Sequence, residues 1–363
     1  MTSLRKLLFI SPCTPDPQGT GWEQRAFAFL RAYSKFTDVE LWFTPTPDNP
    51  ELLRIEKLTR FCSGMTSFHP LLVNDEKSTL LKKRLNQSLS TSDAVHVFRL
   101  PEMVSAIHHS LLVWDFDELP WSARPISPDQ RRHLEELYSR CFRKCRMVFA
   151  SSGVEKQRAH FDGIAVIPNV AIDPQRSAFE YAEKSPILLF VGSLNYAANI
   201  DALAFFNDSV MPRVVSSIPN IILKAIGRSP VRDGARSAVN QFEATGRFQF
   251  DFDVPSCTPH YLQAVASISP IRYGGGTRIK IIKSFAHRCP VVSTTKGCEG
   301  LEVAHRKHLL IEDTPDGFAS ACVELFQTPH LRREVAENAY SFFERNHSQS
   351  VVDRLLVTAF RKL

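Results

Sequence analysis

The chain repeatedly alternates short, almost continuously apolar runs with amphipathic stretches, and this alternation constrains its fold most strongly. A strand that is buried on both faces has a continuous apolar sequence, whereas a strand on a solvated sheet alternates apolar and polar residues. The runs therefore predict parallel sheets that are covered by helices. In the first half of the chain the predicted strands span residues 6–11, 39–44, 94–100, 111–117, 147–152 and 165–168.

The same alternation begins again after residues 169–185, which contain Pro174 and several charges but show no clear periodicity. Two such halves predict an α/β protein with two Rossmann-like, doubly wound domains that face each other across a cleft. We expect a first domain at residues 1–180, a second at 186–345, and a C-terminal helix at 346–363 that packs back on the first domain. The predicted strands of the second half span residues 187–192, 221–227, 247–252, 267–271, 290–294 and 309–312.

Composition and charge exclude several classes of protein. The 363 residues are 44% hydrophobic and 23% charged, which is ordinary for a globular protein and not for a disordered one. The net charge of +6 is spread along the chain, so we expect no nucleic-acid partner. No apolar stretch reaches the roughly 18 residues of a transmembrane helix. The eight scattered cysteines fit reduced thiols in a cytoplasmic protein.

Three consecutive glycines, Gly274, Gly275 and Gly276, stand between a predicted strand and a predicted helix. Glycines let the backbone approach a ligand without a clash from Cβ, and the free N–H groups at a helix N-terminus favour an anion. Cationic and hydroxyl side chains flank the glycines, namely Arg272, Thr277, Arg278 and Lys280. The segment therefore predicts a diphosphate site, although a plain left-handed turn before a basic helix has the same pattern.

Two other loops of the second half follow predicted strands and should lie at the same sheet edge. The residues that we expect to contact the ligand from these loops are Gly192, Ser193, Ser293, Glu299 and Gly300. Glu299 can accept hydrogen bonds from sugar hydroxyls, or equally it can cap its own turn. For Asn199, which follows the first of these loops, a helix N-cap is the stronger interpretation.

The first half has a matching loop, in which Gly19 and Gly21 precede the first predicted helix and are candidate ligand contacts. His96 lies on a predicted strand and is a candidate catalytic residue, although a single histidine beside a strand is more often structural.

Asp115 and Asp117 point to the same face of their predicted strand, and Asp117 is a further catalytic candidate. Such a pair can hold a metal ion. The second half contains another pair of this kind, Asp251 and Asp253, and neither pair has a further ligand nearby. We therefore expect no metal site.

A basic cluster ends the helix that we expect at residues 127–145. Its members are Arg140, Arg143, Lys144 and Arg146. These cations suit anionic lipid headgroups, but a solvated helix face with favourable charge at its C-terminus explains them as well. We expect at most weak peripheral membrane contact, at the inner face of the membrane; the oligomeric state is left open.

In combination, several motifs of the second half resemble those of the donor-binding domain of bacterial family 4 glycosyltransferases, which have the GT-B fold. The resemblance covers about residues 187–345, and the first half matches more loosely, through its glycine loop and residues 115–119 and 166–169. The matching segments of the second half are 189–193, 195–196, Asn199, 225–227, 270–272, 274–280, 290–294, Gly297, 299–301 and 308–311.

The resemblance implies transfer of a sugar from a nucleotide-diphosphate sugar, UDP- or GDP-linked, to a glycan, lipid-linked or other hydroxyl acceptor. It also implies a place in polysaccharide or glycoconjugate biosynthesis, retention of the anomeric configuration, and no essential metal or other cofactor. Arg278 and Lys280 would stabilise the leaving diphosphate, and His96 would stand near the histidine that relatives often supply on the acceptor-side domain. The donor contacts that it carries over are Gly274, Gly275, Gly276, Thr277, Arg278, Ser293, Glu299 and Gly300.

Lys283 departs from the family pattern, because many relatives carry a glutamate there that binds the ribose hydroxyls. A lysine has only donors and cannot accept those hydrogen bonds. The departure leaves a second interpretation open, a non-catalytic GT-B protein that binds a sugar nucleotide or a partner chain. A sugar-nucleotide epimerase of the same fold is weaker, because Glu299 is the only acid that we can place near the donor.

Overall fold

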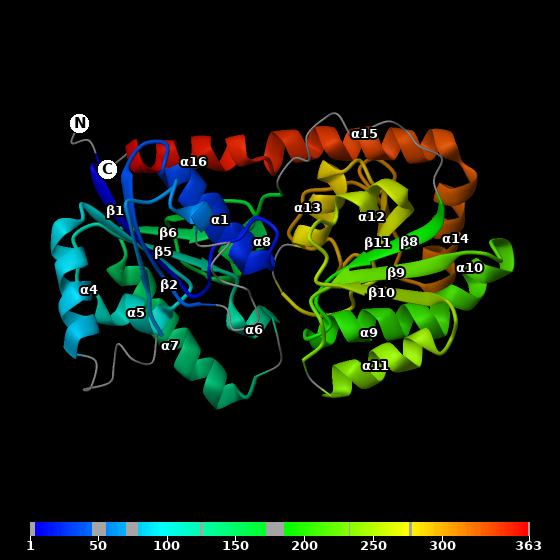
Figure 1. Ribbon diagram of the computed structural model, residues 1–363, viewed down its shortest axis with the longest axis horizontal. Helices are drawn as coiled ribbons and strands as arrows, with labels where there is room; N and C mark the ends of the chain where they lie inside the picture. The colour runs from blue at the N-terminus through cyan, green and yellow to red at the C-terminus, as the bar shows by residue number, and fades with distance from the viewer. Residues whose placement is uncertain are drawn as a thin grey trace. The chain divides into compact units, whose positions relative to one another are not determined.

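The computed structural model divides the chain into two compact units, which are described separately (Figure 1). Unit 1 comprises Met1–Val170 and Gln349–Leu363, and unit 2 comprises Ala171–Ser348. Within them the structure describes residues 4–45, 56–69, 79–123, 126–171, 185–231, 233–275 and 278–361.

Unit 1 contains a parallel sheet of seven strands in the order β3-β2-β1-β4-β5-β6-β7. The strands are β1 (Lys6–Ser11), β2 (Asp38–Phe43), β3 (Gly64–Ser67), β4 (Ala94–Phe98), β5 (Leu112–Asp117), β6 (Met147–Ala150) and β7 (Ile164–Val166). Its central strands are buried along their whole length, as continuous apolar runs predict.

Helices connect the strands of unit 1 and cover its sheet. They are α1 (Gly21–Tyr33), α4 (Thr79–Thr91), α5 (Pro101–Ala106), α6 (Pro120–Ala123), α7 (Pro128–Lys144), α8 (Gly153–Arg158) and α16 (Gln349–Arg361). The C-terminal helix α16 packs on α1, where the Gln349 side chain donates to the carbonyl of Ala28 over 2.9 Å and Phe360 contacts Tyr33 edge-on. No helix in the described ranges is long and apolar enough to cross a bilayer.

Unit 2 repeats this architecture with six parallel strands in the order β10-β9-β8-β11-β12-β13. The strands are β8 (Ser185–Val191), β9 (Ile222–Gly227), β10 (Phe248–Phe252), β11 (Ala264–Ser269), β12 (Val291–Ser293) and β13 (Leu310–Ile311). The helices are α9 (Ala197–Phe205), the π-helix η2 (Phe206–Val210), α10 (Met211–Ser217), α11 (Asp233–Glu243), α12 (Thr258–Gln263), α13 (Ile279–Ala286), α14 (Pro315–Gln327) and α15 (Pro329–Asn346).

The fold class predicted from the sequence, two doubly wound α/β domains, is confirmed. The strand β3 was not predicted, because it is a four-residue edge strand in which only one residue is buried and which lacks an apolar run. The cleft between the two domains remains a prediction.

The strand order of each sheet changes direction at one place, between β1 and β4 in unit 1 and between β8 and β11 in unit 2. Ligands of open α/β sheets bind beside that switch point, at the carboxyl ends of the strands. In unit 2 the backbone is tight there, since a Cβ on Gly227 would lie 2.3 Å from the carbonyl oxygen of Gly192. Glycine at position 227 therefore lets the ends of β8 and β9 meet.

His96 lies in the core of unit 1, contrary to its expected catalytic role. It is fully buried in β4, its ring stacks on Phe9 and contacts Phe29 and Phe149, and its Nδ1 shares a hydrogen bond of 2.9 Å with the Tyr33 hydroxyl. A ring that is enclosed by aromatic side chains has no access to a ligand. Desolvation, and after it the charge of Arg25, lowers the pKa of His96 well below its usual range.

Replacing Gly227 with alanine should lower the free energy of unfolding of unit 2 by about 1–3 kcal/mol, because the new Cβ meets rigid backbone. Gly234→Ala is the matched control, because nothing lies within 4 Å of the Cβ position of Gly234 in α11. This substitution should raise the free energy of unfolding by about 0.5–1 kcal/mol, because alanine favours a helix more than glycine does. All four tryptophans belong to unit 1. Tryptophan fluorescence therefore reports on the urea transition of unit 1 alone, and circular dichroism reports on both units. Equal changes in the free energy of unfolding in the two variants would contradict the close approach of Gly227 to the Gly192 carbonyl.

The buried His96 should make unit 1 less stable in mild acid. Because its pKa is low in the folded state and about 6.5 in the unfolded state, the unfolded chain binds the proton first as the pH falls below 6.5. Its contribution to the free energy of unfolding is therefore complete above pH 6.5 and is lost below it, at up to about 1.4 kcal/mol per pH unit. Urea titrations followed by tryptophan fluorescence should show a smaller acid slope in His96→Gln; an unchanged slope refutes the assignment.

Candidate anion-binding site

The turn after β11 closely follows the sequence prediction in the part that the structure describes. Gly274 has a φ of +103°, and a Cβ there would lie 2.4 Å from the Tyr196 hydroxyl, so only glycine fits. The expected contacts Gly276 and Thr277 lie outside the described residues. The turn thus brings bare backbone to the carboxyl edge of the sheet beside the switch point.

Arg278 stands at the N-cap position of α13 and is only 8% exposed. Its Nη1 donates to the Gly275 carbonyl over 2.7 Å and its Nη2 to the Tyr273 carbonyl over 3.4 Å. Its Nε is buried and has no hydrogen-bond partner among the described residues. The guanidinium therefore braces the turn and keeps its Nε–H donor unused.

Lys280 lies in the first turn of α13 and points at the loop after β8. Its ammonium donates to Asn199 Oδ1 over 2.8 Å and lies 4.2 Å from the centre of the Phe190 ring. A Cβ on Gly192 would come within 3.0 Å of that ammonium, which explains the glycine. Desolvation, and after it the positive charge of Arg278, lowers the pKa of Lys280 well below its usual range.

Arg278 and Lys280 form a positively charged centre that no acidic side chain among the described residues neutralises. Within the described ranges neither makes an ion pair with a carboxylate, and their contacts are with carbonyl oxygens, an amide oxygen and an aromatic ring. A buried charge is costly unless an opposite charge accompanies it. The geometry therefore favours an anionic ligand at this edge.

The loop after β8 positions Lys280 through Asn199. The Asn199 amide donates to the carbonyl of Ser193 over 2.7 Å, while its Oδ1 accepts from Lys280. Asn199 lies inside α9, and Tyr196 occupies the N-cap position, so the expectation that Asn199 caps the helix was wrong. The sequence gives no local sign of the Asn199–Lys280 contact, because 81 positions separate the two residues.

Two residues expected to contact the donor are used within the protein. Arg272 forms a two-point ion pair with Asp201, including an Nε–Oδ2 bond of 3.0 Å, and stacks on Phe205. Ser293 is fully buried, and its hydroxyl contacts the carbonyls of Thr294 at 2.9 Å and Ser269 at 3.3 Å. Arg272 thus ties the turn to α9, and Ser293 braces the end of β12.

Glu299, Gly300 and Lys283 stay predictions as donor contacts. Glu299 forms an ion pair with Lys296 over 2.6 Å, and Gly300 has a φ of +85° that its turn requires. Lys283 is buried one turn after Lys280 on the same face of α13, because residues three apart in a helix share a face.

In unit 1 the glycine loop serves the start of α1. A Cβ on Gly19 would lie 2.4 Å from a carboxylate oxygen of Glu23, and that carboxylate accepts from the N–H of Thr20 over 2.6 Å. Gly19 therefore makes room for a helix cap, and Gly21 is the first residue of α1. This arrangement does not support a ligand contact at Gly19 or Gly21.

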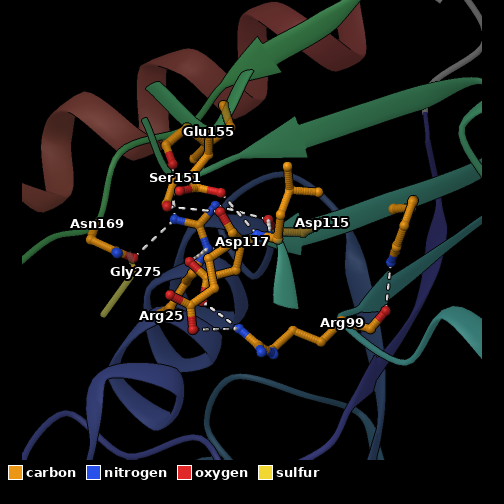
Figure 2. A network of polar contacts seen from close by, with 12 residues as sticks. Arg25, Arg99, Asp115, Asp117, Ser151, Glu155, Asn169 and Gly275 are labelled. Carbon is orange, nitrogen blue, oxygen red and sulfur yellow. Dashed lines mark hydrogen bonds and ion pairs between the residues drawn. The ribbon is translucent and has the colours of Figure 1, made fainter. Parts of the chain in front are cut away.

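Asp117 belongs to a buried network at the end of β5 (Figure 2). Arg25 holds Asp115 with two hydrogen bonds of 2.7 and 2.9 Å and also donates to the Ile167 carbonyl. Asp117 has a φ of +60° and accepts from Arg99 over 3.0 Å. The pair Asp115 and Asp117 is thus neutralised by arginines rather than arranged around a metal ion.

The second aspartate pair is also accounted for by protein contacts. Asp251 pairs with Lys224 over 2.8 Å, and Asp253 accepts from the N–H of Ser229 over 3.3 Å. The described parts of the chain hold no group of three or more histidine, cysteine or acidic side chains that could bind a metal ion. Independence from metal stays a prediction.

The basic residues expected to face a membrane lie at the end of α7 and just beyond it. Arg143 donates to Ser139 over 2.6 Å, and Lys144 donates to the carbonyl of Ser105. Arg140 and Arg146 are exposed. Peripheral membrane contact stays a prediction.

Comparison with known proteins supports the assignment of unit 2. The family model of glycosyl transferases group 1 matches residues 185–328. An uncharacterized 44.6 kDa protein in the cps region of Klebsiella pneumoniae is 26% identical over 172 residues. That match covers 46% of this chain and 43% of the relative, so the chain spans less than half the length of this curated relative.

Solved structures match nearly the whole chain at low identity. Sucrose-phosphate synthase from Thermosynechococcus elongatus is 14% identical with a TM-score of 0.75, covering 99% of this chain and 98% of that one. Anabaena HepE, solved with UDP and glucose, is 12% identical with a TM-score of 0.69 over 99% and 100% of the chains. TarM from S. aureus is 9% identical with a TM-score of 0.70 over 98% and 100%.

The family match covers β8 to α14, including the turn that carries Arg278, and the structural matches extend over both units. The chain therefore has the GT-B fold, and its residues 185–328 match the family model of glycosyl transferases group 1.

Proposed function

We propose that the chain is a glycosyltransferase that moves a sugar from a nucleotide-diphosphate sugar to a hydroxyl group of a glycan or lipid-linked acceptor. The observation that carries this proposal is a pair of cations at the switch point of unit 2, Arg278 and Lys280, which no carboxylate in the described part of the chain compensates. A diphosphate supplies the negative charge that this centre lacks.

The relatives support the choice of donor and of pathway. Anabaena HepE was solved with UDP-glucose, and S. aureus TarM was solved with UDP. We therefore favour a UDP-linked donor, with a GDP-linked donor as the alternative. The cps-region relative favours a role in the synthesis of a cell-surface polysaccharide.

In the proposed reaction, the bond between the anomeric carbon of the sugar and the diphosphate oxygen breaks, and the electron pair stays on the oxygen. The acceptor oxygen forms a bond with that carbon, and its proton passes to the leaving diphosphate, which gains the electron pair. Arg278 and Lys280 stabilise the charge that grows on the leaving diphosphate, and they do so in a site that needs little reorganisation. Two fixed cations can serve in place of a divalent metal; retention of configuration is carried over from the family resemblance.

Lys283 favours a second candidate function, a GT-B protein that binds a sugar nucleotide without turning it over. A lysine cannot accept from ribose hydroxyls, so a contact that many relatives use is missing. Release of UDP from UDP-glucose, with water or a panel of saccharides as acceptor, separates the two functions. Binding without any release would favour the non-catalytic protein.

Arg278→Ala should weaken the binding of UDP by about 1.5–3 kcal/mol, because a charge-assisted contact to the diphosphate is lost. Isothermal titration calorimetry measures the change. Arg213→Ala is the control, since this exposed arginine of α10 pairs with Asp316 away from the turn. Equal affinities of wild type and Arg278→Ala would remove Arg278 from the site.

Lys283→Glu should make the affinity for UDP depend on the ribose hydroxyls, since a carboxylate accepts from them and a lysine does not. We expect the ratio of the dissociation constants of 2′-deoxy-UDP and UDP to rise in the variant. Lys307→Glu, an exposed charge reversal in the same unit, should leave the ratio unchanged. A change below about twofold, or 0.5 kcal/mol, would mean that Lys283 lies outside the donor site.

A further inference from the structure

Two exposed tyrosines flank the glycine-rich turn. Tyr196 is 39% exposed and Tyr273 is 40% exposed. In the described part of the chain they are two of five large hydrophobic side chains with this degree of exposure. Aromatic rings left open to solvent beside a ligand site are candidates for contact with that ligand.

Both tyrosines are tied to Arg278. The Tyr196 hydroxyl and Arg278 Nη2 lie 2.4 and 3.3 Å from the same point, the Cβ position that Gly274 leaves empty. The carbonyl of Tyr273 accepts from Arg278 Nη2 over 3.4 Å. Whatever Arg278 binds is therefore a near neighbour of both residues.

The backbone around both tyrosines is fixed without a ligand. The N–H of Tyr196 donates to the Ser193 carbonyl over 3.3 Å, and Tyr196 is the N-cap residue of α9. Tyr273 follows Arg272, whose ion pair with Asp201 anchors the turn to the same helix. Residues held in this way lose little conformational freedom when a ligand binds.

We propose that Tyr196 and Tyr273 form the contact surface for the sugar of the donor, and that this sugar is an uncharged pyranose. The proposal rests on the proposed function, because it assigns the diphosphate to Arg278 and Lys280. One oxygen atom separates the sugar from the diphosphate, whereas a ribose lies between the diphosphate and the base. Two uncharged parts of the donor therefore adjoin the diphosphate, the sugar and the ribose, and we assign the sugar to the tyrosines.

The charge around the tyrosines supports an uncharged sugar. Arg272 is the cation next to Tyr273, and its charge is compensated by Asp201. The surface therefore offers aromatic faces and phenol hydroxyls, which suit the C–H groups and hydroxyls of a pyranose. The other cation beside the tyrosines among the described residues is Arg278, which the proposed function assigns to the diphosphate, so neither is left for the carboxylate of a sugar acid.

Calorimetric dissociation constants of two probe pairs, UDP with UDP-glucose and GDP with GDP-mannose, test the proposal. In wild type one sugar nucleotide should bind more tightly than its own diphosphate. Tyr196→Ala and Tyr273→Ala should each raise the dissociation constant of that sugar nucleotide about fivefold. The dissociation constant of the diphosphate should change less than twofold. Tyr196→Phe should keep most of the advantage, and Val231→Ala, which alters another exposed apolar residue of unit 2, should keep all of it.

Four results would overturn the proposal. Equal weakening of the diphosphate and the sugar nucleotide would assign the tyrosines to the nucleotide. Unchanged affinities, or no advantage of the sugar nucleotide in wild type, would mean that the tyrosines do not contact the sugar, while the proposed diphosphate site would stand. Failure of wild type to bind any of the four probes would instead refute the proposed function, and the inference with it.

Discussion

The desolvated positive charge of Arg278 and Lys280 is the interaction on which the proposed chemistry of the molecule depends. Both side chains are held by neutral partners within the described residues, and burial together with Arg278 lowers the pKa of Lys280. A protein gains nothing in stability from two cations that repel each other beside a sheet edge. Their placement indicates a preorganised anion site, because the charge of a bound anion offsets the repulsion between Arg278 and Lys280 in the free protein.

Other parts of unit 2 serve this pair of cations. Gly227 lets β8 and β9 come together, and Gly192 leaves room for Asn199 and the ammonium of Lys280. Gly274 leaves room for the Tyr196 hydroxyl beside Arg278. Each glycine marks a place where two loops approach more closely than a side chain would allow, and together they explain why the edge is built from backbone.

The fold was predictable because strands buried on both faces have continuous apolar sequences, and the strands β1 and β8 lie close to where those runs were found. The glycine turn was predictable because its signal is also local, three consecutive glycines between a strand and a helix. The partners of site residues were not, because they depend on contacts between distant positions. Arg272 bonds to Asp201 across 71 positions, and His96 enters an aromatic core that no local pattern reveals.

Proton uptake during UDP binding tests the central claim most directly. Calorimetry from about pH 7 to pH 10, in two buffers with different ionisation enthalpies at each pH, measures it. Burial lowers the pKa of Lys280 and a bound diphosphate raises it again, so protons are taken up in the pH range where Lys280 titrates. The account predicts net uptake with UDP, none with uridine, and loss of the uptake in Lys280→Met. UDP binding without proton uptake, or equal binding of uridine and UDP, would contradict it.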